Sequence, residues 1–296
     1  MYIAASRTAD GARPRSRLSW AVPRNVLALG AVSLVTDVSS EMVTAVLPLY
    51  LTLFLGLSPL QFGLLDGLSF GVTALVRLTG GNLADRWQRR KLVAGIGYGL
   101  SALCKPALLA AGGSVAALGA VIAADRAGKG LRTAPRDALI SLSVPPGRLG
   151  QAFGVHRAMD TVGALLGPLA AFAILTGTGG AYDAVFVAGF CVAVLGVLLL
   201  VMYVRDRSTP LPGPRSATSP RAALGLLRDA AFRRVCAVAV ALGLVTVGDA
   251  FVYLLLQRRG GIDIAYFPLL PIGTAAVYLL LAVPAGRLAD RLGRFP

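Results

Sequence analysis

Long apolar stretches are the feature that most restricts how this chain can fold. Residues 26–55 form an apolar run of about 30 residues, which exceeds the signal-peptide core of roughly 7–15 residues. A helix needs about 20 residues to cross a bilayer core of about 30 Å. On that measure the chain holds eight membrane-spanning segments, at residues 26–55, 60–80, 92–111, 115–134, 152–175, 184–204, 235–256 and 265–285. We therefore expect an all-α integral membrane protein.

The composition excludes the main soluble classes and gives no sign of a metal or a cofactor. Charged residues make up 15% of the chain and hydrophobic residues 56%, whereas an ordinary soluble protein is about 25% charged. The three cysteines form no CxxC pair, and His156 is the single histidine. A disulfide framework or structural zinc site needs more ligands at closer spacing, so we expect neither metal nor cofactor.

The basic residues fall on one side of the predicted membrane. The net charge is +15. Lys and Arg concentrate in the tail before residue 25 and in the even-numbered connections, while the odd-numbered connections hold only Arg258 and Arg259. Cytoplasmic segments carry such an excess of basic residues. We therefore expect a multi-pass protein of the inner (plasma) membrane with a cytoplasmic N-terminus, and no nucleic-acid partner.

An internal repeat divides the chain into two related parts. Residues 81–91 read GNLADRWQRRK, and about 205 residues later residues 286–294 read GRLADRLGR. A polar, Pro-rich stretch separates the parts and reads as a linker. The repeat predicts a cytoplasmic tail (1–24), a six-helix bundle (25–204), a cytoplasmic linker (205–234) and the first two helices of a second bundle (235–296).

These loops resemble the signature loop of the major facilitator superfamily and its repeat in the second bundle. The matching positions are Gly81, Asp85, Arg86, Arg89 and Arg90 in the first copy and Gly286, Asp290, Arg291 and Arg294 in the second. The resemblance implies that the loops control conformational change. It also implies twelve helices in two bundles and a monomer when complete. We expect the chain, which ends inside the second loop, to be a fragment, a frameshift or a mis-called gene; a genuine eight-helix protein is the alternative.

Two shorter elements are also similar to motifs of that family. Arg126, Lys129 and Gly130 resemble its RxxQG element, with lysine at the usual glutamine position. The positions Gly163, Gly167 and Pro168 resemble its GxxxGP element, which is typical of antiporters. Small residues at this spacing also favour close helix packing.

Charged residues inside the apolar segments mark a candidate site. Each costs about 2.5–3.5 kcal/mol at a helix centre, so such residues face a cavity or one another. Asp37 and Glu41 lie roughly 18 Å and 24 Å into their helix and share one face. On 115–134 and just beyond, Asp125, Lys129, Arg132 and Arg136 form one stripe. We expect a central substrate and proton cavity lined by Asp37, Glu41, Arg126, Lys129, His156, Arg157, Asp160 and Asp249.

A structural alternative remains open for two of these helices. Asp125 or Asp160 could pair with Arg126 or Arg157 and clamp the first bundle. For Asp37 and Glu41 we favour the cavity, because their own helix offers no cation. Two carboxylates in a poorly solvated cavity are candidate proton carriers.

The resemblance implies a secondary active transporter of a small organic solute that works by alternating access, with proton-coupled efflux by antiport. Its partners would be the solute, protons and the lipid bilayer. The sequence contains no P-loop and no run of residues at metal-ligand spacing, so we expect no enzyme. The alternatives are a non-transporting sensor or assembly protein and a membrane-embedded enzyme acting on lipid-linked substrates. The sequence does not identify the substrate.

Overall fold

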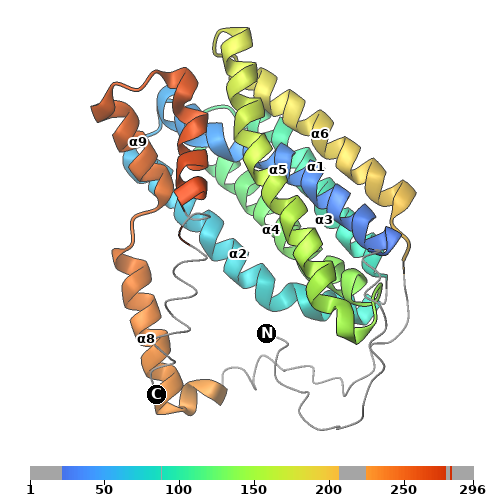
Figure 1. Cartoon of the computed structure of the whole chain (residues 1–296). Coiled ribbons are helices and arrows are strands. Elements are labelled where there is room, and N and C mark those ends of the chain that lie inside the picture. The colour runs from blue at the N-terminus through green and yellow to red at the C-terminus, as the bar shows by residue number, and fades with distance from the viewer. Residues whose placement is uncertain (1–21, 88, 207–224, 278–280, 282–296) are drawn as a thin grey trace.

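A computed structural model describes residues 22–87, 89–206, 225–277 and 281, and the regular elements in these ranges are all helices (Figure 1). This confirms the expected all-α class. The first bundle consists of α1 (Arg24–Leu49), continued by the π-helical η1 (Tyr50–Phe54), then α2 (Pro59–Trp87), α3 (Arg90–Ala110), α4 (Val115–Ser141), α5 (Leu149–Thr178) and α6 (Tyr182–Tyr203). A 3₁₀ turn, η2 (Pro146–Arg148), connects α4 to α5.

Four of the described helices are both long and apolar enough to cross a membrane. They are α1 with its η1 extension, α3, α5 and α6. The helices α2 and α4 are also long enough, with 29 and 27 residues. Charges interrupt α4 at Asp125, Arg126, Lys129 and Arg132, and such a helix is stable in a bilayer only when neighbouring helices or a cavity accommodate the charges.

The helices of the first bundle pack in a definite order. In the contact pattern α1 lies against α5 and α6, α3 lies against α4 and α6, and α2 lies against α4 (Figure 1). Glycines permit the closest crossings. A β-carbon at Gly97 on α3 would lie 2.6 Å from the carbonyl oxygen of Gly128 on α4. Backbones that approach this closely gain van der Waals contact, which is the main attraction between helices in lipid.

Buried apolar side chains form two layers at opposite ends of the first bundle. One layer includes Val26, Leu29, Tyr98, Leu139 and Leu200, and the other includes Val43, Tyr50, Leu108, Ile122 and Phe186. Most of the buried polar and charged side chains lie between these layers, at residues 33–41 of α1, 101–105 of α3, 125–136 of α4 and 156–160 of α5. A polar layer therefore crosses the bundle near the middle of its helices.

The seventh segment differs from the prediction of one helix over 235–256. It forms two helices, α8 (Ala230–Val245) and α9 (Asp249–Gly260), and α8 follows the short η3 (Leu226–Arg228). Thr246 and Gly248 are extended, with ψ of 122° and 145°. The β-branched run Val245–Val247 loses side-chain freedom in a helix, and the glycine adds backbone freedom that a helix must restrict. The single-helix prediction is therefore wrong.

The eighth predicted segment begins as the 3₁₀ helix η4 (Ile264–Leu269), with Pro268 inside it, and helical structure continues to Val277. This segment packs on the first bundle, where the rings of Tyr266 and Phe172 stack with centroids 5.6 Å apart. The helix α9 also contacts the bundle, because Phe251 meets Phe62 of α2 edge to face at 5.0 Å. By contrast, α8 stands apart from helices α1 to α6 (Figure 1).

Candidate functional site

An ion pair in the polar layer joins α1 to α4. Nη2 of Arg132 lies 3.3 Å from Oδ1 of Asp37. Arg132 is buried, and its guanidinium also lies over the ring of Tyr98 on α3, 4.6 Å from the centroid. The cation that Asp37 lacks on its own helix thus comes from α4, and its positive charge is shared with an aromatic face.

A second group of polar side chains connects α1, α4 and α5 around Ser33. The Ser33 hydroxyl lies 3.5 Å from Nε2 of His156 and 3.5 Å from the hydroxyl of Tyr98, and it accepts a hydrogen bond of the same length from Arg136. Nε2 of His156 is 3.6 Å from Oδ1 of Asp160. Both His156 and Asp160 are buried. The predicted residues of α5 therefore meet those of α1 in one polar cluster.

Arg157 lies at the edge of this cluster. Its guanidinium approaches Asp160 at 3.5 Å, but 76% of the side chain is exposed. An ion pair between exposed groups contributes little to stability. The clamp alternative required a pair between Asp160 and Arg157, and this pair is present. Both residues belong to α5, however, so the pair does not hold two helices together.

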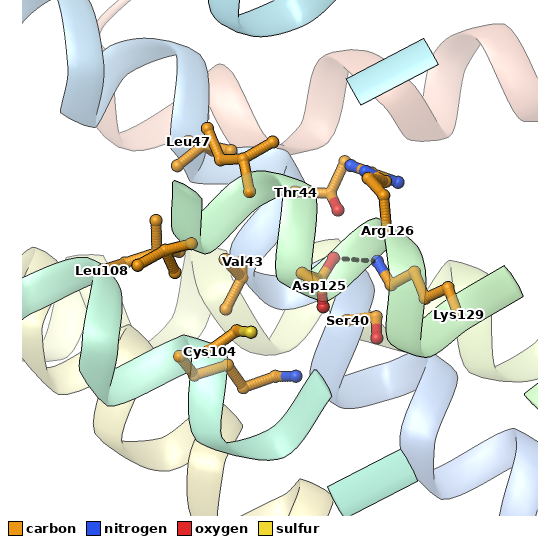
Figure 2. Close-up of a pocket in the computed structure, with 12 residues that line it drawn as sticks. Ser40, Val43, Thr44, Leu47, Cys104, Leu108, Asp125, Arg126 and Lys129 are labelled. Atoms are coloured by element: carbon orange, nitrogen blue, oxygen red, sulfur yellow. Dashed lines mark ion pairs between the residues drawn. The ribbon is translucent and has the colours of Figure 1, made fainter. Parts of the chain in front are cut away.

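A cavity opens between α1, α3 and α4 (Figure 2). On its α4 side, Nζ of Lys129 pairs with Asp125 at 3.2 Å. Ser101 of α3 donates a 2.5 Å hydrogen bond to the same carboxylate. The buried Lys105 donates to the carbonyl of Ser101 at 3.2 Å. The partner of Asp125 is thus Lys129, not the Arg126 that the clamp alternative named.

Glu41 lies between the two clusters. The charges that act on it most strongly are those of Lys129 and Asp37. Among the described residues its carboxylate makes no hydrogen bond or ion pair shorter than 4 Å. The α5 glycines bring that helix close to this part of α1. A β-carbon at Gly167 would lie 2.6 Å from Cβ of Glu41, and one at Gly163 would lie 3.1 Å from Cβ of Asp37.

The structure does not bring Asp249 to this site. Asp249 is the exposed first residue of α9, because the break at 246–248 starts a new helix there. The expectation of a mid-helix position is wrong. The adjacent Gly248 instead faces α2, where a β-carbon would lie 2.9 Å from Oδ2 of Asp66.

The signature loops are described only in part. Gly81, Asp85 and Arg86 fall within α2, which continues to Trp87, and Arg89 and Arg90 stand at the start of α3. Arg90 is buried, with 2% exposure. The side chains of Asp85 and Arg86 lie outside the described part of the chain, as do Gly286, Asp290, Arg291 and Arg294 of the second copy.

Sequence reasoning missed several side chains of the polar layer, although helical spacing could have found them. Ser33 precedes Asp37 by four residues, and Ser101 precedes Lys105 by four. Residues at this spacing share a helix face. Arg132 and Arg136 were recognised as part of the α4 stripe but were not assigned to the cavity. Tyr98 gives no local signal, because its role depends on α4 packing beside it.

The fold is that of a multi-pass helical membrane protein with a layer of buried charges. The model of the Major Facilitator Superfamily matches residues 29–296. The chain therefore belongs to the major facilitator superfamily, whose members are transporters and not enzymes.

Two similar curated proteins come from an archaeon and a bacterium. An uncharacterized MFS-type transporter of Methanocaldococcus jannaschii is 36% identical over 191 residues, which are 63% of this chain and 46% of the relative. An uncharacterized protein of Mycobacterium tuberculosis is 35% identical over 160 residues, which are 54% of this chain and 38% of the relative. The matches thus span less than half of either relative.

Solved structures share the fold at low sequence identity. The inward-facing, unoccupied structure of a bacterial homolog of the human lysosomal transporter Spinster gives a TM-score of 0.68 at 19% identity, over 95% of this chain and 65% of the other. A peptide transporter POT in complex with alafosfalin gives 0.55 at 23% identity, over 81% and 50%. A POT family transporter in complex with 5-aminolevulinic acid gives 0.57 at 16% identity, over 89% and 52%.

Proposed function

We propose that this protein is a secondary active transporter that exports a small organic solute across the plasma membrane in exchange for protons. Glu41 is the observation that carries the proposal. Its carboxylate lies mid-helix in the polar layer, beside the Asp37–Arg132 pair, and has no ion-pair partner among the described residues. In an apolar bundle, the charged form of a carboxylate is costly when no cation lies beside it, and binding a proton removes that cost. Such a group is suited to take up and release a proton.

The contacts of Asp37 suggest how a proton acts on the helices. Protonation of Asp37 removes the charge that holds Arg132 and leaves Tyr98 as the one direct contact that the described structure gives to that buried guanidinium. A buried cation without its anion is costly, so α1 and α4 should then separate or acquire a new anion. Such a step couples proton binding to helix movement, as alternating access requires.

The charge distribution supports an orientation. With the N-terminus in the cytoplasm, the basic tail and even-numbered connections lie on the side that retains positive charge. The short connection between α3 and α4, residues 111–114, then faces the exterior, and η2 faces the cytoplasm.

Proton movement in liposomes tests the proposal. The purified protein is reconstituted into vesicles that enclose a pH-sensitive dye, and solute gradients are imposed from a panel of carboxylates, amines, sugars and short peptides. Peptides are included because structural neighbours are peptide transporters. At least one solute class should drive proton movement opposite to its own flow. The proposal of antiport is wrong if no solute moves protons, or if the solute and the protons move in the same direction.

Two variants localise the coupling. Glu41→Gln keeps the side-chain shape but removes the titratable group, so proton-coupled flux should fall to the level of empty vesicles while the protein stays folded. Asp183→Asn is the matched control, because Asp183 lies exposed in the first turn of α6, and it should transport normally. Coupled flux that survives both Glu41→Gln and Asp37→Asn would remove these residues from the proton path.

A further inference from the structure

The cavity between α1, α3 and α4 has a charged wall and an apolar wall (Figure 2). The charged and polar lining residues are Ser40, Thr44, Lys105, Asp125, Arg126 and Lys129. The apolar lining includes Val43, Leu47, Leu108 and Ile122, with Cys104 beside them. Ligand pockets commonly combine an apolar surface with a few convergent polar groups in this way.

The cavity lining has more positive than negative charge. Lys105, Arg126 and Lys129 face a single lining carboxylate, Asp125. That carboxylate is already occupied, because it pairs with Lys129 at 3.2 Å and accepts a hydrogen bond from Ser101. Lys105 uses the Ser101 carbonyl. Asp125 therefore provides no partner for the third cation, Arg126.

Arg126 carries unused hydrogen-bond donors. Within the described ranges its guanidinium makes no ion pair or hydrogen bond, and its Nε is buried without a partner. The hydroxyl of Ser40, on the facing helix α1, is likewise buried and unbonded. Buried polar groups are normally satisfied, so these two groups indicate an acceptor that the described part of the chain does not supply.

Two other carboxylates act on Arg126 from outside the lining. The charges of Glu41 on α1 and Asp66 on α2 both influence it. Neither approaches within ion-pair distance, so neither satisfies its N–H donors. These carboxylates therefore lie near Arg126 without filling its hydrogen bonds.

We propose that this cavity within the first bundle binds a small organic anion with a short aliphatic part, such as a short-chain carboxylate. The anionic oxygens accept from Arg126 and Ser40, because guanidinium donors match the planar geometry of a carboxylate. The aliphatic part lies against Val43, Leu47 and Leu108. This inference rests on the proposed transport function and names the substrate class of that function.

Alkylation of Cys104 reports on occupation of the cavity. The sequence has three cysteines, so Cys191→Ser and Cys236→Ser leave Cys104, a lining residue, as the one thiol. The protein is held in a neutral detergent without any gradient, and the rate of reaction with N-ethylmaleimide is measured with sodium butyrate, sodium acetate or n-butylamine hydrochloride at equal ionic strength. Butyrate should slow the reaction at least about fivefold, acetate less, and butylamine not at all.

Substitutions at Arg126 show whether its positive charge is responsible for butyrate binding. Arg126→Gln should raise the butyrate concentration needed for half protection at least about tenfold, since it removes the partner of a poorly solvated charge. Arg126→Lys should restore part of the affinity. The matched control Arg258→Gln alters an exposed arginine near the end of α9 and should bind butyrate as the unmodified protein does.

Several outcomes would overturn the inference. These are equal protection by butyrate and butylamine, unchanged affinity in Arg126→Gln, and protection by phosphatidylglycerol but not by butyrate, which would assign the cavity to a lipid headgroup. If Cys104 does not react, binding of butyrate and butylamine to the same proteins is measured by calorimetric titration instead. The same comparisons between ligands and between variants then decide the outcome. Because binding is measured without a gradient, its failure leaves proton coupling intact, and failure of proton coupling in vesicles leaves binding intact.

Discussion

Gly167 of α5 and Glu41 of α1 are so close that a β-carbon on the glycine would lie 2.6 Å from Cβ of the glutamate. The same position would lie 2.8 Å from the carbonyl oxygen of Val38 and 2.9 Å from the amide nitrogen of Met42. Backbone atoms cannot turn away as a side-chain end can. The glycine therefore determines how closely α5 approaches the acidic face of α1.

Gly167→Ala should destabilise the protein by about 1–3 kcal/mol, which is the usual cost of overpacking. Thermal unfolding in detergent measures the change. Gly154→Ala is the matched control on the same helix, because its β-carbon would meet nothing within 4 Å, and it should be neutral or stabilise by up to about 1 kcal/mol. Equal effects at the two positions would contradict the close crossing of α1 and α5.

Asp37 and Arg132 should show energetic coupling in a double-mutant cycle. Removing either partner leaves the other charge buried, whereas Asp37→Asn with Arg132→Gln leaves no charge at the pair. We expect the double variant to be more stable than the sum of the single changes predicts, by about 0.5–3 kcal/mol. Reversible unfolding in mixed detergent provides the four free energies. Arg132→Gln combined with Asp183→Asn should be additive, since Asp183 is exposed at the start of α6.

Ser101→Ala should weaken the contact between α3 and α4. The change removes the 2.5 Å hydrogen bond to the Asp125 carboxylate, and a hydrogen bond to a charged group contributes about 1.5–3 kcal/mol. Thr176→Ala removes an exposed hydroxyl that bonds within its own helix, so its unfolding temperature should not change. A loss no larger than that of Thr176→Ala would show that Lys129 alone holds Asp125.

Cysteine labelling checks the proposed orientation. Gly113→Cys lies between α3 and α4, and Gly147→Cys lies in η2 between α4 and α5; neither side chain would meet a neighbour within 4 Å. In a background where the three native cysteines are serine, an impermeant maleimide should label intact cells at position 113. Labelling at position 147 should require permeabilised cells. The reverse pattern would place the N-terminus outside.

Apolar run length was enough to locate the helices of the first bundle and to assign the class of protein. Every spanning helix must cross the same bilayer thickness, so its length can be recognised from one stretch of sequence without knowledge of the other helices. The segments predicted at 92–111 and 184–204 differ only slightly from α3 and α6. The prediction failed at 246–248, where a β-branched run and a glycine interrupt the apolar segment without making it less hydrophobic.

The sequence by itself determined that the protein spans a membrane, belongs to a transporter family and carries charges in its helices. Only the tertiary structure decided which charges meet. Asp37 and Arg132 are 95 residues apart in the chain, and their contact depends on the rotation and spacing of α1 and α4, which glycines on neighbouring helices set. Likewise, Glu41 differs from Asp37 in having no ion-pair partner in the described structure. Hydropathy and spacing act within one helix, whereas charge pairing depends on the packing of several helices together.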